Sequence, residues 1–140
     1  MLKELSTWIV QRVNGLGCTP ALVIGGNIQV GFRAVDAPVR CHAFLESGGA
    51  LPAFGLVDRI DYMLQIVTRA ETYQIARADA WAIFDAINGT AGWRIAALTS
   101  GGQAYEAQVI EALAAPQYIG QDEKGAFEFS TNYQFKMKTA

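Results

Sequence analysis

The sequence predicts an α+β fold, with an N-terminal helix and a long central helix packed on one face of a mostly antiparallel sheet. Apolar residues recur at helical spacing in residues 2–14 and 72–88. Apolar and polar residues alternate strictly in residues 127–138 and less strictly in residues 58–69, which is typical of long strands. No internal repeat or linker interrupts this order, so we expect one domain over residues 1–140.

The first part of the chain is expected to hold one helix and two short strands. The helix ends at Asn14-Gly15, because glycine is common just after a helix. Residues 28–33 and 39–45 alternate as short strands do, and Pro38 lies in a turn between them. The apolar stripe of the helix consists of Leu2, Leu5, Ile9, Val13 and Leu16.

The middle of the chain is expected to hold the central strand and the central helix. Both faces of residues 58–69 carry apolar side chains, which predicts a central strand covered on both sides. Thr72 is the expected N-cap of the helix, and Gly89 follows its end. Residues 93–98 are expected to form a short strand, whereas residues 108–114 fit either a strand or a short helix.

The final strand shows the clearest alternation in the chain. About eleven residues at roughly 3.4 Å each give a length of roughly 37 Å, close to the diameter of a compact domain of this size. We expect its apolar face to lie in the core, and its edge and polar face to meet a neighbouring subunit. The apolar face consists of Phe127, Phe129, Thr131, Tyr133, Phe135 and Met137.

The composition indicates an ordered globular protein whose surface is partly covered by partners. Hydrophobic residues make up 51% of the chain and charged residues 17%, against a typical charged share of about 25%. The net charge is −2 and no basic run occurs, which argues against sequence-independent binding of nucleic acid phosphates. Neither a membrane-spanning run nor a secretory signal is found, so we expect a protein made in a cytoplasm, without a membrane partner.

Residues that could carry chemistry are few, and we predict no catalytic residue, no cofactor and no metal ion. Cys18 and Cys41 match no metal-ligand spacing and are expected to be buried thiols rather than a disulfide. His42 follows Cys41 in a strand, so the two side chains point to opposite faces and His42 is expected to be partly exposed. A pairing of Cys18 with His42 stays open.

Other candidate patterns are better explained by structure than by chemistry. The glycine-rich residues 25–27 and 47–49 lack the spacing of a phosphate-binding loop. Asp58 and Asp61 fall on opposite faces of a strand and cannot share a substrate. The aromatic residues of the final strand would need a basic groove around them to stack on single-stranded nucleic acid, and the nearby lysines lie on the other face.

Five residues are predicted to contact a second subunit or a partner protein. Three are large apolar residues in a segment rich in glycine and proline, where exposure to water is unfavourable unless something covers them. The other two are lysines on the polar face of the final strand. They are Leu51, Phe54, Leu56, Lys136 and Lys138.

Several short motifs occur in an order that resembles a family of small tailed-bacteriophage proteins, the minor capsid or tail terminator (tail-completion) proteins. They are GNIQVGF at 26–32, APV at 37–39, FLESGG at 44–49, VTR at 67–69, NG at 88–89, APQYIGQDEKG at 115–125 and STNY at 130–133. Each motif is a turn or a strand end, so their order along nearly the whole chain carries the resemblance. The chain departs from the family near Val35, where prolines are common.

The resemblance implies a structural virion protein of the phage tail or neck, assembled in the host cytoplasm. Such a protein caps the head-proximal end of the tail tube as a hexameric ring, stops tube polymerisation and joins the tail to the head–tail connector. The tail tube protein and the connector protein would be its partners, and DNA would pass through the lumen without specific binding. One alternative is a head-completion or connector adaptor of the neck. Another, of a different class, is a small cytoplasmic enzyme or ligand-binding domain that uses Cys18, Cys41 or His42.

Overall fold

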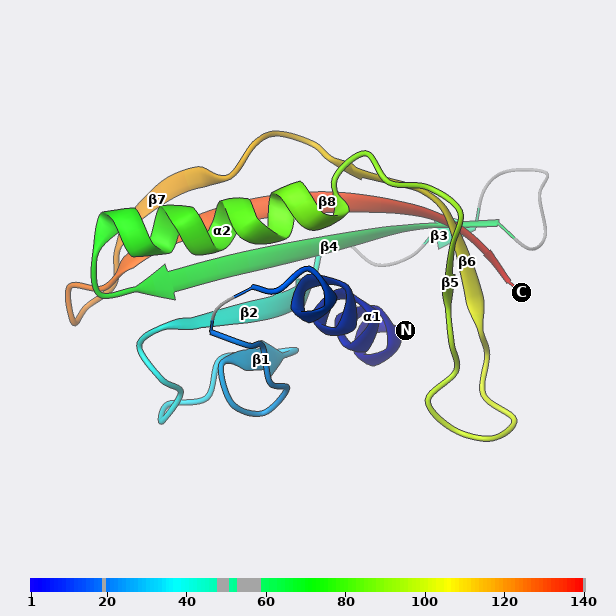
Figure 1. The fold of residues 1–140 in the computed structure, drawn as a ribbon, viewed down its shortest axis with the longest axis horizontal. Helices are drawn as coiled ribbons and strands as arrows, with labels where there is room; N and C mark the ends of the chain where they lie inside the picture. The colour runs from blue at the N-terminus through cyan, green and yellow to red at the C-terminus, as the bar shows by residue number, and fades with distance from the viewer. Residues whose placement is uncertain (19, 48–50, 53–58, 140) are drawn as a thin grey trace.

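The computed structural model describes residues 1–18, 20–47, 51–52 and 59–139. They form an α+β structure in which two helices cover one face of a curled, mixed sheet (Figure 1). The helices are α1 (Leu2–Gly15) and α2 (Tyr73–Ile87). The strands are β1 (Ile28–Val30), β2 (Cys41–Glu46), β3 (Leu51–Pro52), β4 (Arg59–Ala70), β5 (Trp93–Ile95), β6 (Tyr105–Ala112), β7 (Gln117–Gln121) and β8 (Phe127–Thr139).

The sheet is built around the antiparallel pair of β4 and β8. Its strand order is β1-β2-β4-β8-β6-β5, with β3 added to β4 and β7 added to β8. The β4–β8 register runs without a break from Arg59 opposite Lys138 to Ala70 opposite Phe127. β1 pairs with β2 in parallel, so the expectation of a mostly antiparallel sheet holds except at this edge.

Both helices pack on the same face of the sheet, as the sequence predicts. In Figure 1 α2 lies in front of β4 and β8, and α1 lies next to α2 on the side of β2. The hairpin of β5 and β6 turns away at the end where the chain terminates. α2 has 15 residues and α1 has 14, so α2 is not the markedly longer element that was expected. Neither described helix is long and apolar enough to span a membrane.

The core lies between this sheet face and the helices. Alternation on β8 places Tyr133, Phe135 and Met137 there, fully buried, because every second side chain points to the same face. Trp8 of α1 meets Phe135 edge to face, with ring centroids 6.4 Å apart. Phe129 is buried in a second, smaller cluster with α2, so the core role predicted for the final strand is correct.

Local signals fix the ends of α2. The Thr72 hydroxyl accepts a hydrogen bond from the Ile75 backbone N–H at 3.3 Å, which is the expected N-cap. After the helix, Gly89 has a φ of +74°, a left-handed conformation that favours glycine. Its N–H donates to the Ile110 carbonyl at 2.8 Å and so ties the helix end to β6.

Two predictions about the strands need correction, and one open alternative is settled. Residues 117–121 were expected to belong to a turn but form β7, which pairs with β8. β6 settles the ambiguity of residues 108–114 in favour of a strand. β4 is central, but both described helices lie on one side of it, and on the other side most of its side chains are only half-buried. We call that second side of the sheet the open face.

We expect Phe135→Ala to lower the free energy of unfolding by about 3–5 kcal/mol, because it removes a fully buried ring and leaves a cavity. Gln134→Ala is the matched control, since Gln134 is the neighbouring residue on the open face and should cost less than about 1 kcal/mol. Urea unfolding of both variants measures the difference. Equal losses would show that the two faces of β8 are not packed differently.

Candidate functional site

The predicted contact residues fall in two places. Phe54 and Leu56 lie outside the described residues, and of Leu51 only the backbone is described, as part of β3 opposite Asp61. Lys136 and Lys138 lie on the open face, as the alternation predicts. Their role as contacts stays a prediction.

Four charged side chains on the open face are paired across strands. Lys136 Nζ lies 3.4 Å from Glu111 Oε1, and Lys138 Nζ lies 3.7 Å from Glu106 Oε2. All four side chains are partly exposed, so each pair contributes at most about 1 kcal/mol to stability. Pairs this weak can exchange partners at little cost when another protein approaches.

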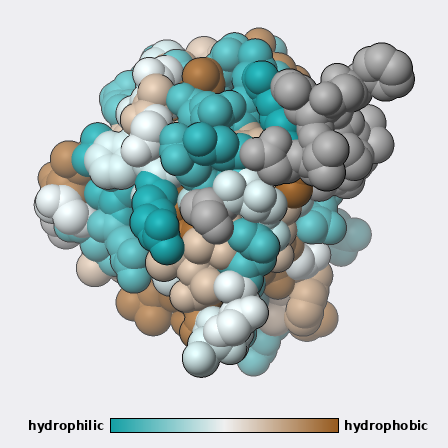
Figure 2. Space-filling model, turned by 90° about the vertical axis from the view of Figure 1, so that its right-hand side faces the viewer, coloured by the Kyte–Doolittle hydropathy of each residue, from teal (hydrophilic) through white to brown (hydrophobic). Residues whose placement is uncertain are grey.

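The end of the molecule where β6 begins and β8 finishes has a mixed surface. Hydrophilic and hydrophobic side chains lie side by side there, without one continuous apolar patch (Figure 2). Specific protein contacts outside permanent dimers have a similarly mixed character. This end therefore combines groups that water solvates with apolar groups that a partner could cover.

At the opposite end of β4, Arg69 joins two loops. Its guanidinium donates from Nε to the Val39 carbonyl at 3.0 Å, and from Nη2 to the carbonyls of Pro38 at 2.8 Å and Ala37 at 3.4 Å. Nη1 donates to Asp122 Oδ2 at 3.3 Å. We call this set of contacts the Arg69 clamp.

Asp122 organises the turn between β7 and β8. Its Oδ1 accepts from the backbone N–H groups of Lys124 and Ala126, both at 2.9 Å. The pKa of the Asp122 carboxyl lies below its ordinary value, mainly because of the hydrogen bond from Ala126. The bond from Lys124 and the nearby Arg69 guanidinium lower the pKa further. The carboxylate therefore stays charged and acts as a fixed anchor for the clamp.

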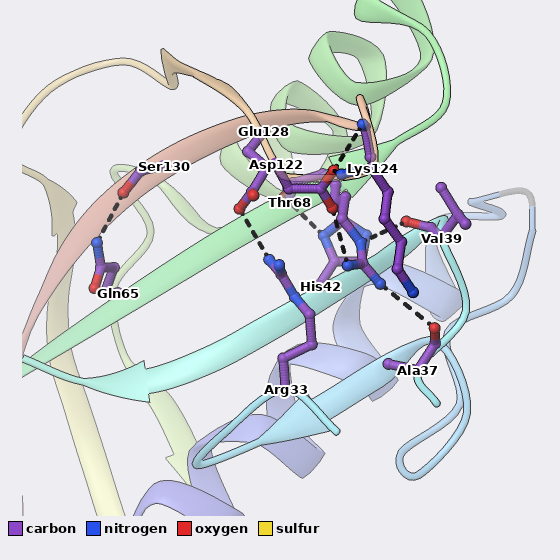
Figure 3. Close-up of polar contacts among 12 residues, drawn as sticks. Arg33, Ala37, Val39, His42, Gln65, Thr68, Asp122, Lys124, Glu128 and Ser130 are labelled. Atoms are coloured by element: carbon purple, nitrogen blue, oxygen red, sulfur yellow. Dashed lines mark hydrogen bonds and ion pairs between the residues drawn. The ribbon is translucent and has the colours of Figure 1, made fainter. Parts of the chain in front are cut away.

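A second ion pair fastens the same loop to the open face. Arg33 reaches across β4 to Glu128 on β8, where Nη2 lies 3.1 Å from Oε2 (Figure 3). Nearby, the Gln65 amide donates to Ser130 Oγ at 3.0 Å. Residues 31–40 thus cover part of the open face. They are held there by the contact of Arg33 with Glu128 and by the contacts of Arg69 with loop carbonyls, and in each case the two partners lie far apart in the sequence. Sequence reasoning missed both Arg33 and Arg69, because no local pattern links them to their acceptors.

A cleft of about 300 Å³ opens beside the Arg69 clamp. One wall is apolar and includes Val35, whose side chain is almost fully exposed at 99%. The Arg69 and Asp122 side chains in the other wall already bond to each other and to loop backbone, so they offer recognition rather than acid–base chemistry. The lining residues are Val35, Ala37, Val39, Arg69, Glu71, Asp122, Lys124, Gly125 and Ala126.

His42 is buried, which corrects the expectation of a partly exposed histidine. It is 5% exposed and its Nδ1 shares a 2.8 Å hydrogen bond with Thr68 Oγ1 of β4 (Figure 3). Burial lowers its pKa from 6.5 to about 4, so the imidazole is neutral near pH 7. Beside it, Arg40 makes a bidentate ion pair with Asp79, with both N···O distances at 2.8 Å.

Cys18 and His42 line the same small cavity of about 10 Å³, which is room for about one water molecule. Burial raises the pKa of the Cys18 thiol while it lowers that of His42. An activated cysteine needs the reverse, a thiolate beside an imidazolium. The cavity therefore lacks the electrostatics of a nucleophilic pair.

Within the described ranges, no three His, Cys, Asp or Glu side chains are grouped to hold a metal ion. Both cysteines are free thiols.

We expect Arg69→Gln to lower the free energy of unfolding by about 2 kcal/mol, because three loop carbonyls and Asp122 lose a largely buried donor. Arg94→Gln is the control, because Arg94 is an exposed residue of β5. Urea unfolding measures both variants. A loss no greater than that of Arg94→Gln would mean that the clamp does not stabilise the fold.

We expect stability to fall as the pH drops from about 6.5 towards 4. In that window His42 becomes protonated in the unfolded chain but stays neutral in the folded chain. The contribution of neutral His42 to the free energy of unfolding is therefore fully present above pH 6.5. Below pH 6.5 this contribution falls by up to about 1.4 kcal/mol per pH unit. His42→Gln should remove this part of the slope. Because the chain has one histidine, the difference between urea unfolding curves of wild type and variant isolates it, and identical slopes would refute the prediction.

Comparison with known families shows which family the chain resembles. A sequence model of the family described as bacteriophage tail terminator protein matches residues 49–139, well over half of the chain. The matched region contains β4 and β8, together with α2 and the β7–β8 turn that the Arg69 clamp holds. No curated protein matches the chain.

Proposed function

Because the chain belongs to the bacteriophage tail terminator family, we propose that it caps the head-proximal end of a tail tube, stops tube polymerisation and joins the tail to the head connector. Family membership makes the chain a structural protein of the virion tail. The family match is the main support for the proposal, because the matched residues include β4 and β8, the strand pair on which the sheet is built.

A ring is proposed as the form in which the protein acts, with six subunits as the expected number. A closed ring requires one surface of each subunit to meet a different surface of the next. The fold offers distinct surfaces at its two ends: the mixed surface beside β6 and β8, and the clamped loops with the exposed Phe32 and Val35. Burial of such apolar side chains on assembly favours contact between subunits.

Leu51, Phe54, Leu56, Lys136 and Lys138 are proposed to contribute to contacts with other subunits or with the tube and connector proteins. The three apolar residues belong to a segment rich in glycine and proline, where large apolar side chains favour being covered by a partner. The two lysines supply charged, partly exposed groups whose present partners bind them weakly.

DNA is proposed to pass the ring without specific binding. Strong phosphate binding needs unpaired basic side chains. Three of the described arginines, Arg33, Arg40 and Arg69, are instead paired with carboxylates. The net charge of the chain is −2, which also supports weak interaction with DNA.

Inactivation of the gene is expected to yield tails of abnormal length and filled heads without tails, because tube growth would not stop and the joining surface would be missing. Electron microscopy of lysates measures tail length and attachment, with the wild-type gene supplied in trans as the control. Normal tails that lack only heads, together with finding the protein on filled heads, would refute tube capping and favour a connector adaptor.

A further inference from the structure

One row of paired residues crosses the sheet from β1 to β7. Each member of the row lies opposite the next in the register of neighbouring strands. In order, the row consists of Ile28, His42, Thr68, Phe129 and Tyr118. β1 and β7 therefore lie level with each other on opposite edges (Figure 1), separated by four strand spacings of about 4.8 Å, or roughly 19 Å.

At the β1 edge the row ends in exposed apolar side chains. A parallel bridge joins Ile24 to Ile28, so Ile24 extends the row outwards by one residue. Ile24 is 38% exposed, its neighbour Val23 is 58% exposed, and Phe32, which follows β1, is 69% exposed. The Ile28 N–H and carbonyl bond to the turn before β1, at 3.1 and 2.9 Å. This edge is therefore suited to contact through side chains rather than through backbone pairing.

At the β7 edge the row also ends in exposed apolar side chains. Tyr118 is 45% exposed and Ile119 is 55% exposed. The Tyr118 ring packs on Phe129 with ring centroids 5.7 Å apart, so its position is fixed before any partner arrives. Leu113, which is 61% exposed, lies further along the same edge of β8, where its N–H donates to the Asn132 carbonyl at 2.9 Å. The β7 edge thus offers an apolar surface of fixed shape.

Both edges belong to stretches of sequence without charge. Residues 13–32, which include β1, and residues 112–121, which include β7, contain no Asp, Glu, Lys or Arg. Natural edge strands usually carry charged side chains that discourage contact with another chain. Burial of a charge in an interface is costly, whereas burial of apolar side chains is favourable. The two edges are therefore matched in the character of their side chains.

The charged residues that follow these two stretches are bound within their own molecule. Arg33 follows the first stretch and pairs with Glu128 at 3.1 Å. Asp122 follows the second stretch and pairs with Arg69 at 3.3 Å. A contact between the β1 edge and the β7 edge can therefore form without breaking either ion pair.

The placement of the two edges fits a second copy of this chain as the occupant. A tube or connector protein would stack on the ring along its axis, whereas ring neighbours meet side by side. Opposite edges at the same level let each copy meet the next through β1 on one side and β7 on the other, which is the head-to-tail contact that a closed ring requires. The ends of the strands carry charged side chains instead, such as Lys124 in the β7–β8 turn and Lys138 near the end of β8.

We propose that the β1 edge of one copy contacts the β7 edge of the next, so that Val23 and Ile24 cover Tyr118 and Ile119 of the neighbour. This inference rests on the ring that is part of the proposed function.

Site-specific cross-linking tests the contact. Ile24→Cys and Ile119→Cys are combined in a Cys18→Ser background, because Cys18 is the more exposed of the two native thiols. A short bismaleimide is then applied to the purified protein and to tails isolated from lysates. We expect a ladder of covalent multimers on denaturing gels from the double variant in at least one of the two samples, and monomers from each single variant. Monomers from the double variant in both samples, or dimers from either single variant, would overturn the proposal.

A second cysteine pair serves as the matched control for the cross-link. Leu98→Cys replaces Ile24→Cys in the double variant, since Leu98 is 42% exposed and lies between β5 and β6. This pair should give monomers, because the proposed contact does not bring Leu98 to the β7 edge. An equally strong ladder from the control would mean that the copies collide at random, and would contradict the proposal.

A pair of opposite charges gives an independent measurement. Ile24→Glu and Ile119→Lys should each weaken association of the copies at least about tenfold, by analytical ultracentrifugation or by occupancy of tails, because each places a charge in the contact. Together they should restore much of the association, because the two charges meet across the contact. Leu98→Lys is the control and should have little effect. A double variant no better than the weaker single variant would refute the contact, and urea unfolding checks that each variant is folded.

The contact and the tail function fail in different ways. Absence of the ladder, together with tails of abnormal length after inactivation of the gene, would refute the contact alone. A ladder from the double variant, together with normal tails after inactivation of the gene, would refute the tail function alone.

Discussion

The unbroken pairing of β4 with β8 is the constraint on which the rest of the structure depends. Because the register is continuous from Arg59–Lys138 to Ala70–Phe127, apolar side chains from both strands gather on one face and mostly polar side chains on the other. The helices cover the apolar face, and β2, β3, β6 and β7 add to the outer edges of the pair. A slip of one residue would send the core side chains to the open face, so neither helix could pack.

The parts of the fold that the sequence predicts are those set by short-range patterns. The alternation of β8 and the cap at Thr72 involve residues within a few positions of each other, so their signals are visible without a structure. β7 was missed because its exposed, uncharged residues follow no alternation and contain a glycine bulge. The Arg69 clamp and the buried contact of His42 with Thr68 join residues 26 to 53 positions apart, and no local pattern records them.

The open face shows how a protein of low charge presents a sheet to water. Four of its charged side chains form cross-strand pairs, and residues 31–40 cover part of it through Arg33 and the clamp. In the assembly that we propose, contacts would then depend on a few exposed apolar side chains at the sheet edges, which are specific in geometry.

The position of β8 in the chain also bears on when this protein becomes competent to assemble. β4 is synthesised long before β8, so during translation its apolar face lacks its main neighbour, and the pairing that completes the sheet closes late. β7 has no partner other than β8 in the described sheet, so it cannot present an ordered outer edge until that strand has docked. A chain whose β8 has not docked therefore lacks an ordered β7 strand.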